Sequence, residues 1–159
     1  MYLSKVLKSK IYFLIISFLI TLNANAELVE PNSGIEPYQV VKIQLRSLKK
    51  NDDPKKDNGI EQTWEFAHPS NQKNTGPFNR FKTMIKGKSY MMLLNHLDHK
   101  VVEVKSTDLT ALFEVMVLDK DKAYYKFKWT VEKYTAEGPL KGCWLTTMVS
   151  TPMLLGSSI

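Results

Sequence analysis

The stretch AYYKFKWTVEKY, residues 123–134, decides the fold class of this chain. Large apolar side chains occupy every second position, at Tyr125, Phe127, Trp129 and Val131. Lysine, threonine and glutamate fill the positions between them. An alternation of period two predicts a β-strand that turns one face to a core and the other to water.

Four further strands are expected around this one. Beyond Gly87, β-branched and aromatic residues accumulate in a pattern of period two, which is typical of strands. We expect these strands at residues 90–94, 101–105, 112–118 and 143–149, joined as antiparallel sheet. Residues 112–118, LFEVMVL, are apolar on both faces, which predicts a central strand covered on two sides.

The residues before the sheet have helical spacing. Apolar side chains recur at intervals of three and four, at Tyr38, Val41, Leu45 and Leu48. With Pro37 suited to a first turn, this spacing predicts a helix over 37–50. A second helix is expected from residue 57 or 58 to about residue 68, and a third from Pro77 to Gly87, where glycine would form a left-handed cap. Residues 70–76 are polar and predict a turn-rich loop.

Helices followed by a meandering sheet predict an α+β domain, in which N-terminal helices pack on a curved antiparallel β-sheet. A sheet bent into an open cone leaves a cavity between its concave face and the helices. A cavity of this kind, mostly apolar with a few polar groups, is where we expect a ligand to bind.

An ordered series of motifs supports this architecture. In chain order they are ND (51–52), GI (59–60), WEFAHPSN (64–71), TGP (75–77), RF (80–81), Met84, Tyr90, LLN (93–95) and GCWLT (142–146). The series resembles the domain-of-unknown-function family 4864, whose members occur in bacteria and plant plastids without an assigned activity. The architecture is also similar to the nuclear transport factor 2-like cone, which includes isomerases, small-molecule binders and adaptors. Neither resemblance brings a catalytic residue to this chain.

The first 26 residues have the three parts of a cleaved secretory signal peptide. Three lysines precede an apolar run of twelve residues, 11–22, and Ala24-Asn25-Ala26 supplies a cleavage site before Glu27. Spanning a bilayer takes about 20 residues, so no stable membrane anchor is expected after cleavage, the alternative being an uncleaved anchor. We expect a periplasmic or secreted bacterial protein with a flexible lead-in at 27–36, one domain at 37–150 and a C-terminal tail at 151–159.

Composition excludes several classes of protein. The 159 residues contain one cysteine, Cys143, so an intramolecular disulfide cannot form and a buried thiol is expected. Without the three lysines of the signal peptide, 22 basic residues become 19 against 16 acidic ones, and the net charge falls from +6 to +3. That modest charge, without a basic stripe, argues against nucleic acid as a partner.

The polar segment 68–76 contains the first candidate site. Asn71 and Thr75, with Arg80 one turn into the next helix, would suit a small anionic ligand, because helix N-termini and guanidinium groups attract anions. In the preferred alternative, Asn71 and Thr75 cap turns, and Arg80 pairs with Asp52 or Asp53.

Three tryptophans are candidates to line a pocket for an apolar ligand. They are Trp64, Trp129 and Trp144, the preferred alternative being that they fill the core.

The ionisable side chains give only weak indications of metal binding or catalysis. His96 and His99 fall in a predicted turn, so we expect exposed histidines, no metal and no cofactor. Cys143 is expected to pack rather than react. Glu114 is the best candidate for a buried proton-transferring carboxylate, because its strand is apolar on both faces. The preferred alternative is a solvated edge or a lysine partner.

Three functions stay open. The first is a non-catalytic cone domain that binds a small ligand or a partner protein. The second is a cofactor-independent enzyme of the isomerase or hydrolyase type that uses a buried carboxylate. The third is a structural module that forms a homodimer through the outer face of the sheet, where Tyr124 or Tyr134 would be exposed.

Overall fold

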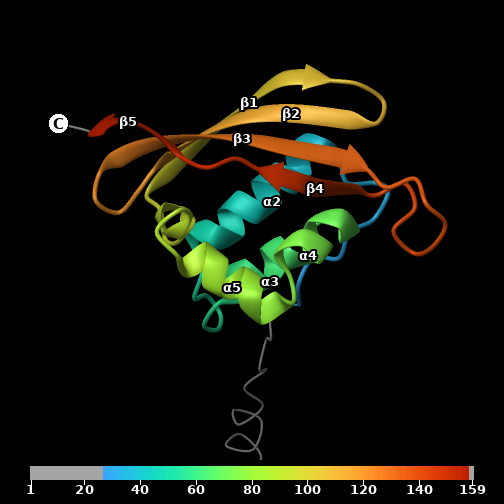
Figure 1. Ribbon diagram of the computed structural model, residues 1–159, viewed down its shortest axis with the longest axis horizontal. Coiled ribbons are helices and arrows are strands. Elements are labelled where there is room, and N and C mark those ends of the chain that lie inside the picture. Colours follow the sequence, from blue (N-terminus) through green and yellow to red (C-terminus); the bar gives the residue numbers. More distant parts are fainter. Residues whose placement is uncertain (1–26, 158–159) are drawn as a thin grey trace, which may run out of the picture.

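The helices come first and the sheet follows. The computed structural model describes residues 27–157. Four α-helices and a short 3₁₀ helix are α2 (Pro37–Lys49), α3 (Asn58–Glu65), α4 (Pro69–Thr75), α5 (Phe78–Lys86) and η1 (Met91–Leu93). Five strands follow, β1 (Asp98–Ser106), β2 (Thr110–Leu118), β3 (Ala123–Lys133), β4 (Trp144–Val149) and β5 (Met153–Ser157). This order confirms the predicted α+β class (Figure 1).

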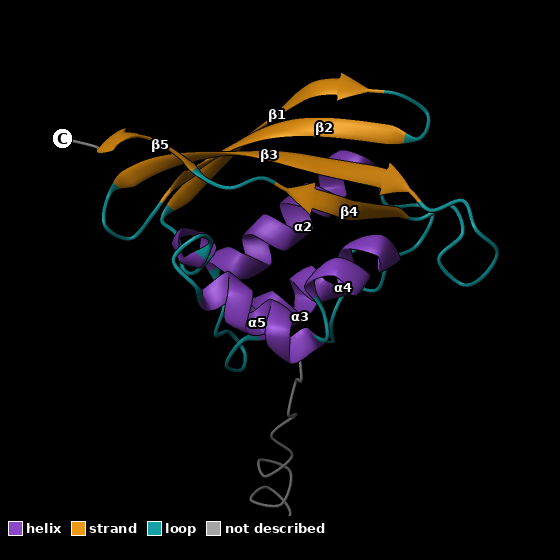
Figure 2. Cartoon of the chain, in the orientation of Figure 1, coloured by secondary structure: helices purple, strands orange, loops and turns teal. Residues whose placement is uncertain are grey.

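The sheet is open and all its strand pairs are antiparallel. The strand order is β1-β2-β3-β4, and β5 pairs with the part of β3 that β4 leaves free. The helices lie against one face of the curved sheet, and no helix covers its other face in the described part of the chain (Figure 2). N-terminal helices packed on a curved antiparallel sheet were expected, and the structure has this arrangement.

The core lies between α2 and the sheet. Buried apolar side chains of α2 share one cluster with those on the inner faces of β2 and β3, and among them are Val41, Leu45, Leu48, Phe113, Val115, Phe127 and Trp129. The alternation predicted for residues 123–134 is confirmed. The prediction that residues 112–118 are covered on two sides is wrong: Met116 on the outer face is only half-buried and lies opposite Lys100 and Lys126. The aliphatic stems of lysines can cover apolar neighbours while their charges stay in water.

A glycine lets α3 approach α2. The backbone N–H of Gly59 donates to the carbonyl oxygen of Asn51 at 2.9 Å. A β-carbon at position 59 would lie 2.2 Å from the carbonyl oxygen of Ser47, which is far inside van der Waals contact. The helical wall of the domain therefore depends on the absence of a side chain there.

Residues 70–76, predicted as a loop, form α4 instead. His68 begins this helix, because its ring accepts a hydrogen bond from the backbone N–H of Ser70, and Pro69 occupies the first turn. Local polar capping outweighs the poor helix propensity of this segment.

The predictions for 87–94 and for the C-terminal tail also need correction. Gly87 ends α5 with a φ of −76°, not in a left-handed cap. Residues 90–94 are not a strand, since η1 turns there and buries Leu93. The segment 151–159, expected as a tail, contains β5.

The predicted signal peptide lies outside the described residues. Among residues 27–157, no helix combines the length and the apolar character that crossing a membrane requires.

Candidate functional site

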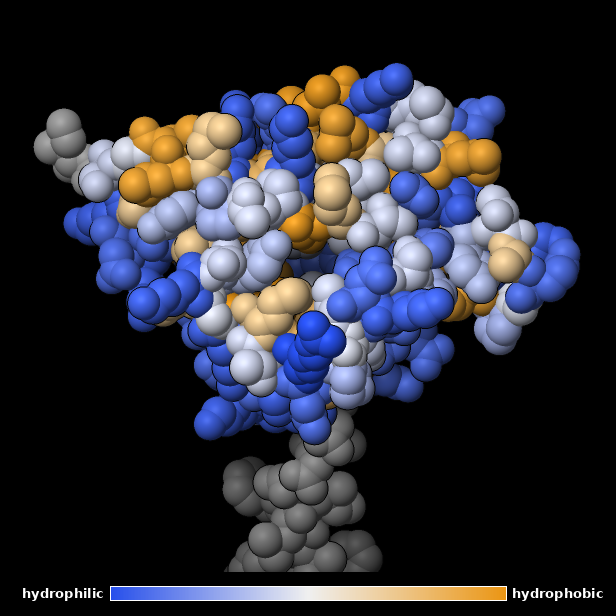
Figure 3. Space-filling model, in the orientation of Figure 1, coloured by the Kyte–Doolittle hydropathy of each residue, from blue (hydrophilic) through white to orange (hydrophobic). Residues whose placement is uncertain are grey.

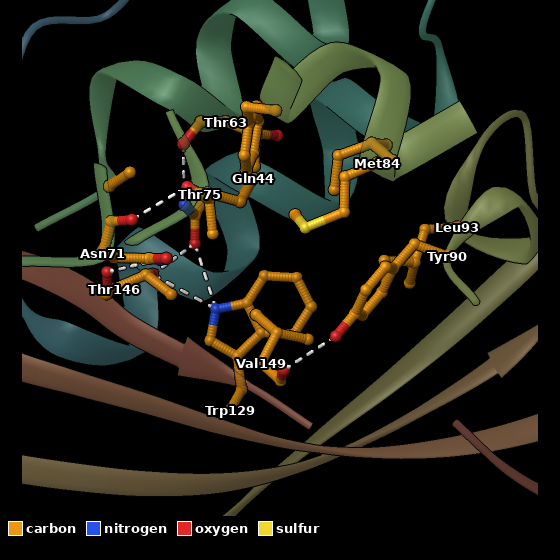
Figure 4. Close-up of a pocket in the computed structure, with 13 residues that line it drawn as sticks. Gln44, Thr63, Asn71, Thr75, Met84, Tyr90, Leu93, Trp129, Thr146 and Val149 are labelled. Carbon is orange, nitrogen blue, oxygen red and sulfur yellow. Dashed lines mark hydrogen bonds between the residues drawn. The ribbon is translucent and has the colours of Figure 1, made fainter. Parts of the chain in front are cut away.

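A pocket of about 80 Å³ lies between the helices and the inner face of the sheet (Figure 4). Within residues 27–157, the wall is formed by all the helices, the connections between them, and strands β3 and β4. The lining residues are Gln44, Thr63, Ala67, Asn71, Thr75, Phe81, Met84, Ile85, Tyr90, Leu93, Trp129, Thr146 and Val149. The cavity that the cone-like architecture predicts is therefore present.

Gln44 is the centre of the polar side of this pocket. It lies on α2 and is 1% exposed. Its Nε2 donates to the carbonyl oxygen of Thr63 at 3.0 Å. Its Oε1 accepts from Trp129 Nε1 at 3.1 Å and from Thr146 Oγ1 at 2.6 Å. One uncharged amide thus joins α2, α3, β3 and β4.

A β-bulge lets Thr146 and Val149 face the pocket together. The register pairs Val131 with Thr146 but Trp129 with Val149, so β4 contains an extra residue between the two pairs. Thr146 and Val149 consequently both line the pocket. A regular alternation would have placed Val149 with Leu145 instead, which is why Thr146 was missed.

The connection between α3 and α4 fixes the position of this bulged strand. The backbone N–H of His68 donates to Thr146 O at 2.9 Å, and the N–H of Thr146 donates to Phe66 O at 2.7 Å. The side-chain amide of Asn71 donates to the same Thr146 O at 3.1 Å. Thr75 donates from its hydroxyl to Asn71 O at 2.8 Å. Asn71, Thr75 and Trp129 are the predicted ligand-binding residues that line the pocket.

The opposite side of the pocket is apolar apart from one phenol. Phe81, Met84 and Ile85 come from α5, and Leu93 from η1. Tyr90 donates from its hydroxyl to Val149 O at 3.2 Å, and burial raises the pKa of this phenol. Tyr90 is the one ionisable side chain in the wall, and it remains protonated at neutral pH.

Arg80 lies outside the pocket. Its side chain is exposed on α5, and within residues 27–157 it forms no ion pair with Asp52 or Asp53. The aspartate that α5 does bind is Asp57, whose carboxylate lies 2.7 Å from Lys86 Nζ. The predicted Arg80 pair is therefore wrong.

Of the three candidate tryptophans, Trp129 lines the pocket and the other two pack elsewhere. The Trp64 ring lies against Phe78 and Phe81, with centroids 5.8 and 4.9 Å away. Trp144 is buried, and Lys133 Nζ lies 4.9 Å from the centre of its ring. Both side chains contribute to packing rather than to the pocket wall, as the preferred alternative held.

Glu114 is not a buried carboxylate. It lies on the outer face of β2, where its Oε1 is 3.5 Å from Lys126 Nζ. The candidate buried carboxylate is therefore wrong, and the preferred alternative, a lysine partner, is confirmed. Cys143 is 2% exposed, and burial raises the pKa of its thiol, which confirms the expected buried cysteine.

His96 and His99 form a partly buried pair, whereas exposed turn histidines were expected. His96 Nδ1 lies 2.7 Å from the carbonyl oxygen of Leu93, so Nδ1 carries the proton. Its Nε2 then accepts from His99 Nδ1 at 2.7 Å. Burial lowers the pKa of His96, and burial with the neighbouring imidazole lowers that of His99 to about 4. In the described part of the chain, no three His, Cys, Asp or Glu side chains come together as a metal site.

No family model, curated protein or solved structure matches this chain. Membership of the domain-of-unknown-function family 4864 therefore stays a prediction.

Proposed function

We propose that this protein is a non-catalytic binding domain that holds a small uncharged ligand between its helices and its sheet. The observation that carries the proposal is the pocket wall. It combines amides, hydroxyls and an indole N–H with an apolar side, and it contains no carboxylate, imidazole, ammonium or guanidinium group.

The size and charge of the pocket define the ligand. A water-sized group needs roughly 10–15 Å³ of cavity, so about 80 Å³ accommodates about six such groups. Burying a charge without a partner costs several kcal/mol. Because Arg80 is exposed and lies outside the pocket, the wall contains no cationic side chain that could bind the predicted anionic ligand.

The same wall argues against proton-transfer catalysis. A general base works best with a pKa near the operating pH, and the pocket's one ionisable group is a phenol with a raised pKa. Tyr90 also donates its proton to Val149 O. The carboxylate considered for an enzyme, Glu114, lies on the other face of the sheet.

We also propose that the protein is exported and that its fold is related to a known cone-shaped architecture. The signal-peptide pattern in residues 1–26 supports export to the periplasm or beyond. Likeness to the nuclear transport factor 2-like cone is compatible with ligand binding, but that support is analogy at the level of the fold.

Native mass spectrometry of gently purified protein tests the proposal, followed by denaturing extraction to identify a released molecule. We expect a stoichiometric small molecule that is absent from Met84→Trp, because tryptophan at position 84 fills the pocket. Met148→Trp on the outer sheet face, where Met148 is 49% exposed, is the matched control and should retain the ligand. Equal occupancy in both variants would contradict the pocket as the site.

One surface feature supports a second candidate, homodimer formation at the corner formed by β5. Met153, Leu154 and Leu155 are 58%, 62% and 47% exposed, and an apolar patch lies over β5 in Figure 3. No charged residue occurs from Val149 to Ser157, so β5 itself brings no like charges to a contact between two copies.

Light scattering after size-exclusion chromatography tests the dimer. We expect the wild type to elute as a dimer and Leu154→Lys as a monomer. A monomeric wild type at high concentration would rule this candidate out.

A further inference from the structure

We infer that the pocket selects ligands that donate hydrogen bonds, an inference that rests on the proposed function. The hydroxyl groups of the wall are the basis. Each of the four is engaged in a hydrogen bond with a protein oxygen atom. The pairs are Thr63 with Gly59 O at 2.8 Å, Thr75 with Asn71 O at 2.8 Å, Tyr90 with Val149 O at 3.2 Å and Thr146 with Gln44 Oε1 at 2.6 Å.

The direction of these hydrogen bonds is fixed by chemistry. Three of the partners are backbone carbonyls, which can only accept, so the hydroxyl donates its single proton. The fourth partner is the Gln44 oxygen, whose identity follows from its neighbours. The indole N–H of Trp129 needs an acceptor there, and Thr63 O needs a donor on the other side of the same amide. No hydroxyl in the wall therefore keeps a proton for a ligand.

The groups that remain are mostly acceptors. Thr63, Thr75 and Tyr90 keep oxygen lone pairs, while Thr146 already accepts from Trp129 Nε1 at 3.2 Å. Asn71 Oδ1 receives no hydrogen bond from a protein donor within residues 27–157, although Asn71 Nδ2 is bound to Thr146 O. Among the side chains of the wall, the free donors are limited to one remaining N–H proton on the amide of Gln44 and one on the amide of Asn71.

This arrangement defines a class of ligand. An anion would meet lone pairs and no cationic side chain, so carboxylates and phosphates are rejected. A molecule with N–H or O–H groups satisfies the oxygens on one side, and a small apolar body fits Phe81, Met84 and Ile85 on the other. Small amides, ureas and alcohols have this chemistry.

Three probes of nearly equal shape separate the possibilities. Isobutyramide both donates and accepts hydrogen bonds, whereas 3-methyl-2-butanone only accepts them. Isobutyrate has the same skeleton as these two molecules but carries a negative charge. We would titrate each into the full protein and follow the indole N–H of Trp129 and the side-chain amides of Gln44 and Asn71 by NMR. We expect isobutyramide to bind about threefold to tenfold more tightly than the ketone, the range of one hydrogen bond, and isobutyrate not to shift these signals.

The outcomes distinguish the inference from the proposed function. If the ketone binds as well as the amide, donor selection is wrong while the proposed function stands. If isobutyrate binds as well as the amide, the uncharged class of ligand in the proposed function is wrong too. If none of the three shifts the pocket signals, both are overturned.

Two threonines provide a matched pair of variants. Thr75 and Thr83 both donate to the carbonyl four residues earlier, but Thr83 is exposed on α5 and outside the pocket. Thr75→Val should weaken isobutyramide about threefold or more and leave the ketone unchanged, and Thr83→Val should change neither. Equal effects of the two variants would overturn the assignment of Thr75 Oγ1 as a ligand acceptor.

Discussion

The two faces of the sheet use polar side chains in opposite ways, as neighbouring residues of β3 show. Trp129 is buried and shares an uncharged hydrogen-bond network with Gln44 and Thr146. Lys128, one residue earlier, is exposed and lies opposite Glu114. Neutral groups that satisfy one another are much less costly to bury than charges. The inner face can therefore be polar enough to recognise a ligand, while the charges remain in water.

The largest loss of stability is expected on the inner side of the sheet, at Gly59, where α3 lies closest to α2. Gly59→Ala places a β-carbon 2.2 Å from Ser47 O, so α2 and α3 must separate. We expect a loss of about 3 kcal/mol or more in the free energy of unfolding, measured by urea denaturation. Gly34→Ala, in the lead-in, is the control and should change stability by less than about 0.5 kcal/mol. A Gly59→Ala protein of wild-type stability would contradict the close crossing.

Breaking the hydrogen-bond network around Gln44 should cause the second largest loss of stability. Gln44→Leu keeps the volume but removes the partners of Thr63 O and of the Thr146 hydroxyl. We expect a loss of about 2–3 kcal/mol, again by urea denaturation. The outer-face counterpart, Lys128→Leu, should stay within about 0.5 kcal/mol. Similar losses from both variants would show that the two faces do not differ as described.

Acid should destabilise the protein through the histidine pair. The pKa of folded His99 is about 4, below the 6.5 of an unperturbed histidine, so between these values the unfolded chain binds more protons. Stability is therefore complete above pH 6.5 and falls as the pH drops towards 4. Melting temperatures across this range should show a shallower slope for His99→Asn than for wild type. An unchanged slope would mean that the pair titrates normally in the folded state.

The smallest effect is expected on the outer face. Glu114→Gln removes an exposed pair with Lys126, and such pairs contribute about 0–1 kcal/mol. We expect a change of under about 0.5 kcal/mol and unaltered binding of isobutyramide. A loss of isobutyramide binding would show that Glu114 contributes to the ligand site, and the hypothesis of an enzyme that uses this carboxylate would then be open again.

The sequence predicted the fold better than the site. Period-two alternation at 123–134 and helical spacing at 37–50 are local signals, and both elements formed with nearly the expected bounds. The bulge that lets Thr146 and Val149 face the pocket together depends on pairing between distant strands and has no local signal. Asn71 and Thr75 were identified for an anion, yet they line an uncharged wall.

Gln44 was detectable but missed. It is a polar residue on the same helical face as Val41 and Leu48, three and four positions away. A single amide on an apolar helix face must find buried hydrogen-bond partners, and here those partners form one side of the pocket.

A crystal structure of the protein soaked in isobutyramide tests the central claim most directly. We predict the molecule in the pocket of Figure 4, with its N–H group within hydrogen-bond distance of Thr75 Oγ1 or Asn71 Oδ1 and its isopropyl group towards Met84. Density for isobutyramide only outside this pocket, or a pocket filled by water alone, would contradict it.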